Sequence, residues 1–103
     1  MKELSVLNRI LILSVVPVEG DLLTMRVVKN FREKVSFTEN ELVEFNLKNN
    51  NGMFTWDRNK ERKIEFEITP KETEMIKEGI EKLNKENKLT EQFIELCDMF
   101  EIV

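Results

Sequence analysis

Residues 45–68 read FNLKNNNGMFTWDRNKERKIEFEI, and here the apolar residues alternate with polar ones. Such alternation is typical of β-strands that bury one face. Asn51-Gly52 is a hairpin turn signal, because both residues tolerate a positive φ. A polar loop at residues 58–61 separates this hairpin from a third alternating run, which ends at Ile68. We predict a short three-stranded antiparallel meander whose apolar face is covered by helices. That face carries Phe54, Trp56, Ile64, Phe66 and Ile68.

The residues before this stretch predict three helices, of which the first runs from about Lys2 to Val16. Its apolar residues occupy nearly the whole circumference of a helix, as in helices that are buried on several sides. A strand at Ile10–Val16 is the alternative, since β-branched residues are frequent there. Pro17 ends either element, because proline has no amide hydrogen to donate.

The second predicted helix follows the N-cap residue Asp21 and runs from Leu22 to about Lys34. Its predicted core-facing residues are Leu23, Val27, Val28, Phe31 and Val35. A third, short helix begins after Thr38, which forms a capping box with Glu41, and ends near Glu44.

Two more helices are predicted after the strands. Thr69-Pro70-Lys71-Glu72 is a capping box with proline at the first helical position, and the helix runs to about Lys85. Gly79 lies in its apolar stripe and predicts a close approach to another element. The last helix is capped at Leu89-Thr90 and extends to about Phe100. The class is therefore α+β, with three N-terminal helices, the meander and two C-terminal helices in a single domain of 103 residues.

The composition lacks most of the side chains that enzymes use for proton transfer and metal binding. The chain contains no histidine or tyrosine, one cysteine and three glycines, whereas histidine is the commonest general base and metal ligand. Cys97 lies on an apolar helix stripe, so core packing is favoured over a nucleophilic role. We therefore predict a protein that is not an enzyme and has no cofactor, metal or catalytic residue.

Two acidic motifs in the sequence resemble cation or catalytic sites. Asp57-x-Asn59-x-Glu61 resembles the opening of a calcium loop, but the required glycine is Arg62 and the twelfth position is Ile68. A second acidic pair, at residues 65 and 67, fits the wet face of a half-buried strand better than a catalytic pair.

The charge is unevenly distributed along the chain. Residues 1–34 carry six basic and four acidic side chains (net +2), and residues 35–103 carry ten basic and sixteen acidic (net −6). The acidic excess repels phosphate backbones and gives no attraction to anionic membranes. One cysteine fits a reducing compartment, so a cytoplasmic location is predicted. The apolar run Ile10–Val18 resembles a signal-peptide core, but it lacks a cleavage site and is too short to span a bilayer.

A winged-helix-like DNA-binding regulator is the alternative function, because three helices followed by a hairpin is the element order of that fold. The difficulty is the third helix, which would read DNA but offers Glu39, Glu41 and Glu44 and no basic residue. The candidate nucleic-acid contacts, on the second helix and at a basic hairpin tip beside Trp56, are Arg26, Lys29, Arg32, Arg58, Lys60, Arg62 and Lys63.

Several short motifs together resemble small proteins encoded by bacteriophages and prophages of low-GC bacteria. They are the run from Val15 to Arg26, Thr38-Glu39-x-Glu41, Phe54-Thr55-Trp56 and Lys88-Leu89-Thr90-Glu91 with Phe100. The resemblance implies an intracellular, phage-related setting and no particular activity.

The leading hypothesis is a small non-enzymatic module that binds a host or phage protein and acts by occupying its surface. Acidic residues on the last two helices could imitate nucleic acid, although a solvated face paired with Lys71, Lys77, Lys82 and Lys85 is favoured. Self-association follows if the first helix exposes more apolar surface than one domain covers. The acidic residues are Glu72, Glu74, Glu78, Glu81, Glu91, Glu95, Asp98 and Glu101.

Overall fold

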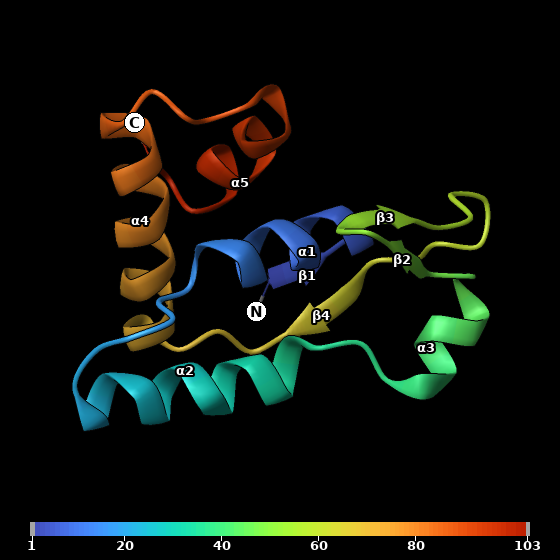
Figure 1. Cartoon of the computed structure of the whole chain (residues 1–103), viewed down its shortest axis with the longest axis horizontal. Coiled ribbons are helices and arrows are strands. Elements are labelled where there is room, and N and C mark those ends of the chain that lie inside the picture. Colours follow the sequence, from blue (N-terminus) through green and yellow to red (C-terminus); the bar gives the residue numbers. More distant parts are fainter. Residues whose placement is uncertain (1, 103) are drawn as a thin grey trace.

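The computed structural model describes residues 2–102, and within them five α-helices accompany two small antiparallel sheets (Figure 1). The α+β class is confirmed. In chain order the elements are β1 (Lys2–Leu4), α1 (Val6–Val15), α2 (Leu22–Val35), α3 (Glu39–Glu44), β2 (Lys48–Asn50), β3 (Met53–Thr55), β4 (Ile64–Phe66), α4 (Pro70–Lys85), the 3-10 turn η1 (Glu91–Phe93) and α5 (Ile94–Met99).

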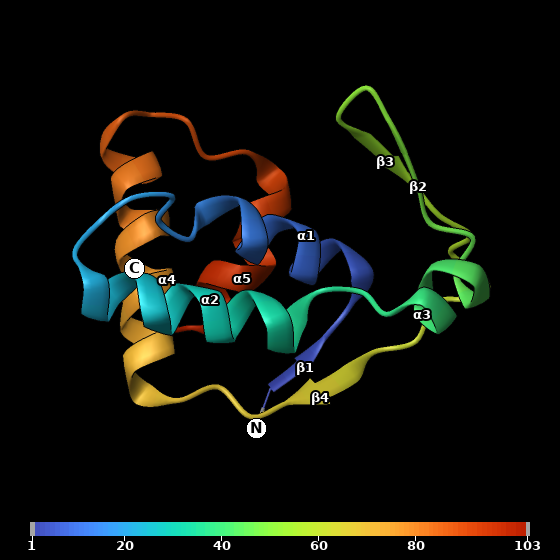
Figure 2. The same ribbon diagram turned by 60° about the horizontal axis from the view of Figure 1, so that its bottom comes forward.

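The three predicted strands of residues 45–68 do not form one sheet, so the meander is a wrong prediction. β2 and β3 form a hairpin around Asn51 and Gly52, whose φ values are 53° and 86°. β4 pairs instead with β1, with Leu4 opposite Ile64. Figure 2 shows the two sheets well apart, with the β2–β3 hairpin projecting from the helices. The physical reason is that Lys2–Leu4, predicted above as part of the first helix, is extended. It pairs with β4 in the place that the prediction gave to β3.

The first helix is confirmed from Val6 onwards, and the alternative of a strand at Ile10–Val16 is wrong. Ser5 caps it by accepting a hydrogen bond from the Asn8 amide, and the Asn8 side-chain oxygen accepts one from the Ser5 amide. None of the helices between residues 2 and 102 has the length and apolar character needed to cross a membrane.

The main core lies where α1, α2, α4 and α5 meet β1. The predicted close approach at Gly79 is confirmed, because a Cβ there would collide with the Val15 carbonyl oxygen and lie 3.1 Å from the Val15 Cβ. The buried residues of this core are Leu4, Leu11, Ile12, Val16, Val28, Phe31, Val35, Met75, Ile76, Ile80, Phe93, Leu96 and Phe100.

A smaller second core fixes the base of the hairpin. Its buried residues are Val6, Phe45 and Leu47, with Ile10, Phe37, Trp56 and Ile64 packed against them. Two predictions of buried residues are corrected here. Phe54 is 41% exposed, because the helices do not cover the far part of the hairpin, and Leu23 is 69% exposed, because the first turn of α2 extends past the core.

The caps predicted at Asp21, Thr38 and Thr69 are confirmed, whereas the one predicted at Thr90 is not. Asp21, Thr38 and Thr69 each accept a hydrogen bond from the backbone amide three residues on. Thr90 makes no such bond, and the chain first forms the 3-10 turn η1, so the predicted cap there is wrong.

Candidate binding surface

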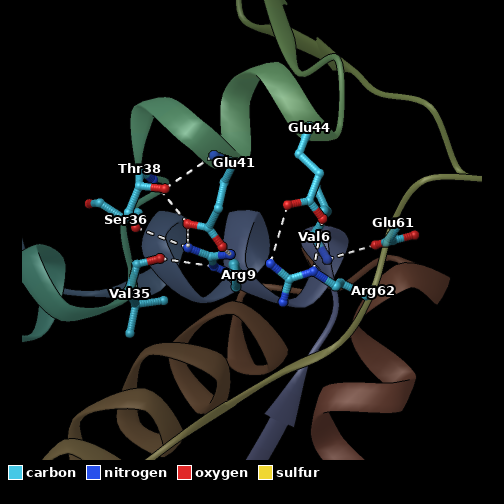
Figure 3. A network of polar contacts seen from close by, with 9 residues as sticks. All are labelled: Val6, Arg9, Val35, Ser36, Thr38, Glu41, Glu44, Glu61 and Arg62. Carbon is cyan, nitrogen blue, oxygen red and sulfur yellow. Dashed lines mark hydrogen bonds and ion pairs between the residues drawn. The ribbon is translucent and has the colours of Figure 1, made fainter.

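A buried ion pair links α1 to α3 (Figure 3). The Arg9 side chain is 2% exposed and lies 2.7 Å from the Glu41 carboxylate. Its guanidinium donates two hydrogen bonds to Glu41, one to the Val35 carbonyl and one to the Ser36 carbonyl. Four of its five N–H groups are thereby used, which is the condition under which a buried charge is tolerated. Arg9 therefore holds the end of α2 and the start of α3 against α1.

The same guanidinium packs between two aromatic rings. Its carbon lies 4.0 Å from the centre of the Phe37 ring and 5.0 Å from that of Phe66. Arginine stacks well in this way because its guanidinium is planar and weakly hydrated. Phe37 therefore packs both on Arg9 and against the second core.

The Glu41 carboxylate is held in its charged form. The hydrogen bonds from Arg9, and to a smaller extent from the Thr38 amide, lower the pKa of Glu41 below its ordinary value, against the opposing effect of burial. Glu41 also completes the cap of α3 with Thr38. One carboxylate therefore serves both the helix terminus and the buried cation.

A second carboxylate ties the loop after β3 to α1. Glu61 accepts a hydrogen bond of 2.7 Å from the Val6 amide at the start of α1, and its other oxygen lies 3.4 Å from the Trp56 indole nitrogen. The Asp57 amide also donates to the Phe45 carbonyl across the hairpin base, at 2.8 Å. The ends of the hairpin are therefore fixed.

The far part of the hairpin, residues 48–55, projects from this base, and we call it the arm. Every residue of β2 and β3 is exposed. The strand pairing puts Phe54 and Asn49 on the face that continues into Trp56, whereas Met53, which is 72% exposed, lies on the outer face. Met53 and Phe54 are therefore both exposed, on opposite faces of the arm. Exposed strand positions are more often polar.

A groove of about 270 Å³ lies between the arm and α1. Only one of its lining residues, Ser14, is polar, and Ser14 donates its hydroxyl hydrogen bond to the Leu11 carbonyl. The groove lies where the arm meets the helices. Phe37, which packs on Arg9, forms one of its walls. It is lined by Ile10, Leu13, Ser14, Phe37 and Phe54. We define the arm and this groove together as the arm surface.

A second exposed apolar patch lies at the connection between α1 and α2. It consists of Val18, Leu22 and Leu23, each at least 69% exposed. The nearest concave surface, at Pro17, is lined also by Glu19, Glu78, Lys82 and Glu86. This patch therefore lacks the apolar groove that distinguishes the arm surface.

The seven predicted nucleic-acid contacts do not form one surface. Figures 1 and 2 place the N-terminal half of α2, which carries Arg26, on the opposite side of the molecule from the loop after β3, and Lys29 lies one turn further along the same helix. That loop holds Arg58, Lys60, Arg62 and Lys63 and joins two different sheets, so it is not the predicted hairpin tip. The true tip is Asn51-Gly52, which carries no charge. Arg32, the seventh, is half-buried on α2.

Several of these basic side chains already have partners. Arg62 makes two hydrogen bonds to Glu44 on α3, Lys63 lies 3.9 Å from Glu95, and Lys29 lies 4.0 Å from Glu33. Arg58 lies over the Trp56 ring at 5.1 Å. The predicted reading helix, α3, carries the Glu44 that pairs with Arg62, and it faces solvent with acidic groups.

The acidic helices are mostly as predicted, with one correction. Glu72 is buried, because it accepts a 2.6 Å hydrogen bond from Lys34 on α2 and caps α4 with Thr69. The remaining acidic residues are exposed. In residues 2–102, no ion pair within 4.0 Å forms inside α4, so the predicted pairing with its lysines is not seen.

The other candidate chemical groups have structural surroundings. Cys97 packs against the main core, and burial raises the pKa of its thiol, as does the Asp98 charge. The Asp57 carboxylate accepts a hydrogen bond from the Asn59 amide, and residues 65 and 67 are exposed as expected. Over residues 2–102, no three acidic or cysteine side chains converge to hold a metal ion.

Sequence reasoning missed Arg9, Ile10, Leu13 and Phe37 as parts of this surface. One signal in the sequence pointed to Arg9. Arg9 interrupts the apolar residues of the first helix, and a charge there requires either exposure or a buried partner. Comparison of the chain with protein-family models, curated proteins and solved structures found no match. The resemblance to phage proteins therefore stays a prediction.

Proposed function

We propose that this chain is a small non-enzymatic, phage-related protein-binding module that occupies a partner protein through the arm surface. The observation that carries the proposal is the exposure of Met53 and Phe54 on an arm that borders an apolar groove. Exposed apolar patches beside a groove are typical of protein-binding surfaces. A rigid base with an accessible arm also suits binding, because the base is ordered before the partner arrives.

The proposal is tested by capture from the lysate of the native host, with and without nuclease. The comparison uses wild-type protein, the arm variant Met53→Ser/Phe54→Ser and the matched control Leu22→Ser/Leu23→Ser, which removes two exposed leucines from the other patch. We expect a protein that wild type and control retain, that the arm variant loses and that nuclease does not release. Capture that is indifferent to the arm variant would reject this function.

The DNA-binding alternative makes an opposite prediction. It requires salt-dependent binding to duplex DNA that is lost when Arg58, Lys60, Arg62 and Lys63 are neutralised. We expect no duplex binding even at low salt, because α3 is acidic and the basic residues are dispersed.

A further inference from the structure

The arm has a free strand edge. Adjacent residue pairs in an antiparallel hairpin alternate between those that hydrogen-bond to each other and those whose N–H and C=O groups point outward. The two-residue turn makes Asn50 and Met53 a bonded pair, and Asn49 and Phe54 the next, outward pair. The backbone groups of Phe54 therefore point away from β2, and those of Trp56 do so two residues on. This spacing is the one that an added strand requires.

The two edges of the arm differ in charge. β2 carries Lys48, and a lysine at a strand edge discourages pairing with another chain. β3 consists of Met53, Phe54 and Thr55, which carry no charge. A hairpin of two strands is only marginally stable by itself, and a third strand supports it. The open edge is therefore that of β3.

The groove gives the added strand a place for its side chains. Phe54 belongs both to the open edge and to the wall of the groove, together with Ile10 and Leu13 of α1. Alternate side chains of an added strand point to the same face. A strand paired with β3 would thus direct every second side chain into an apolar space of about 270 Å³.

The surrounding charge selects the kind of strand. Residues 48–61 carry three cations, Lys48, Arg58 and Lys60, and two carboxylates, Asp57 and Glu61, so this segment has a net charge of +1. In residues 2–102 none of these three cations has a carboxylate oxygen within 4.0 Å. A second copy paired through the same edge would bring two such cationic segments together, and like charges at an interface are unfavourable. An acidic partner is attracted by the same cations.

We infer that the arm surface binds an extended segment of a partner protein, which adds as a strand to the β3 edge, inserts alternate apolar side chains into the groove and carries acidic residues at its ends. This inference rests on the proposed function and specifies its mode of binding.

The test begins with a displayed library of random twelve-residue peptides, selected on the immobilised wild-type protein. The retained peptides should have apolar residues at every second position, flanked by Asp or Glu. Apolar residues at helical spacing, basic flanks or no enrichment at all would overturn the inference.

A retained peptide is then synthesised and its dissociation constant measured by fluorescence anisotropy. Phe54→Ser and, separately, Lys48→Glu/Arg58→Glu should each weaken binding about tenfold or more, which corresponds to about 1.4 kcal/mol. Leu22→Ser/Leu23→Ser is the matched control and should leave the constant unchanged. The charge-reversed variant keeps the test valid if Phe54→Ser fails to fold. Peptides selected on the charge-reversed protein should now have basic flanks.

N-methylation of the peptide separates strand addition from simple groove binding. Methylating the set of alternate amides that faces β3 should weaken binding about tenfold, and methylating the other set should not, because only the first set donates to the arm. Equal effects of both sets would overturn the inference.

Three other results would overturn the inference that an extended segment of a partner protein binds the arm surface. One is a dimer, seen by sedimentation, that Phe54→Ser abolishes. The second is binding of a single-stranded thymidine oligonucleotide that Lys48→Glu/Arg58→Glu abolishes. The third is capture of a host protein that depends on the arm while no strand-patterned peptide is retained, which would leave the proposed function standing and reject only the strand mode.

Discussion

We call the contacts of Arg9 with Glu41, Val35 and Ser36 the Arg9 junction. The Arg9 junction and the arm are neighbours in the fold but are built in opposite ways. At the junction a charged side chain is buried and nearly every polar group on it has a partner. In the arm, apolar side chains are exposed, and within residues 2–102 no strand lies beside the outward backbone groups of β3. The first region resembles a protein interior and the second resembles an interface without its partner. Under the proposed function, stability would reside in the junction and binding in the arm.

Removal of Glu41 should give the largest loss of stability. Glu41→Ala leaves the Arg9 charge buried without its carboxylate, and breaking a buried pair in this way costs about 3–5 kcal/mol. Urea unfolding followed by circular dichroism measures the change. Glu44→Ala on the same helix is the matched control, because its pair with Arg62 is exposed, and it should change stability far less. Equal losses for both variants would erase the distinction between junction and surface.

A side chain at Gly79 should give the next largest effect. Gly79→Ala brings a Cβ against the Val15 carbonyl, and overpacking of this kind costs about 1–3 kcal/mol although alanine favours helices. Gly20→Ala is the control, since its Cβ would meet Thr24 at an ordinary 3.4 Å. Thermal unfolding of both variants decides the matter, and a Gly79→Ala protein as stable as wild type would contradict the close packing of α1 on α4.

Acid should weaken the junction. Since the Arg9 hydrogen bonds lower the Glu41 pKa in the folded state, its contribution is complete above the unfolded-state value near 4.5 and is lost as the pH falls through the lower folded-state pKa. Urea unfolding between pH 6 and pH 3 should show a steeper fall for wild type than for Glu41→Gln, which has no carboxylate to titrate. Parallel curves for the two proteins would refute the assignment.

Substitution of the arm should have the smallest effect on stability. Met53→Ser/Phe54→Ser changes exposed side chains, so the free energy of unfolding should move by less than about 1 kcal/mol. The same variant should lose partner binding. Urea unfolding is again the measurement, and a loss comparable with that of Glu41→Ala would show that the arm is part of the folded core.

Signals confined to a few residues predicted much of the fold. The capping boxes at Thr38 and Thr69 and the Asn51-Gly52 turn were correct, because each is decided by hydrogen bonds or φ preferences within one turn. Gly79 was also interpreted correctly, since a glycine in an apolar stripe implies a close neighbour.

Contacts between distant parts of the chain were not predicted. Lys2–Leu4 joined the first helix in the prediction because its pairing with β4 leaves no local signature. Glu41 was assigned to its cap and to the exposed acidic face of the third helix, whereas its buried pairing depends on Arg9, 32 residues away. Alternation placed Phe54 on the same strand face as Trp56, but its exposure depends on where α1 lies, which local spacing does not encode.

Amide hydrogen exchange, measured by NMR with and without a selected twelve-residue peptide, tests the central claim most directly. In the free protein the amides of Phe54 and Trp56 should exchange much faster than those in the middle of α1 and α4, which should be the slowest. With the peptide bound, the largest gain in protection should fall on Phe54 and Trp56, with α4 unchanged. A largest gain on α2 or α4, or none at Phe54, would contradict the arm as the binding surface.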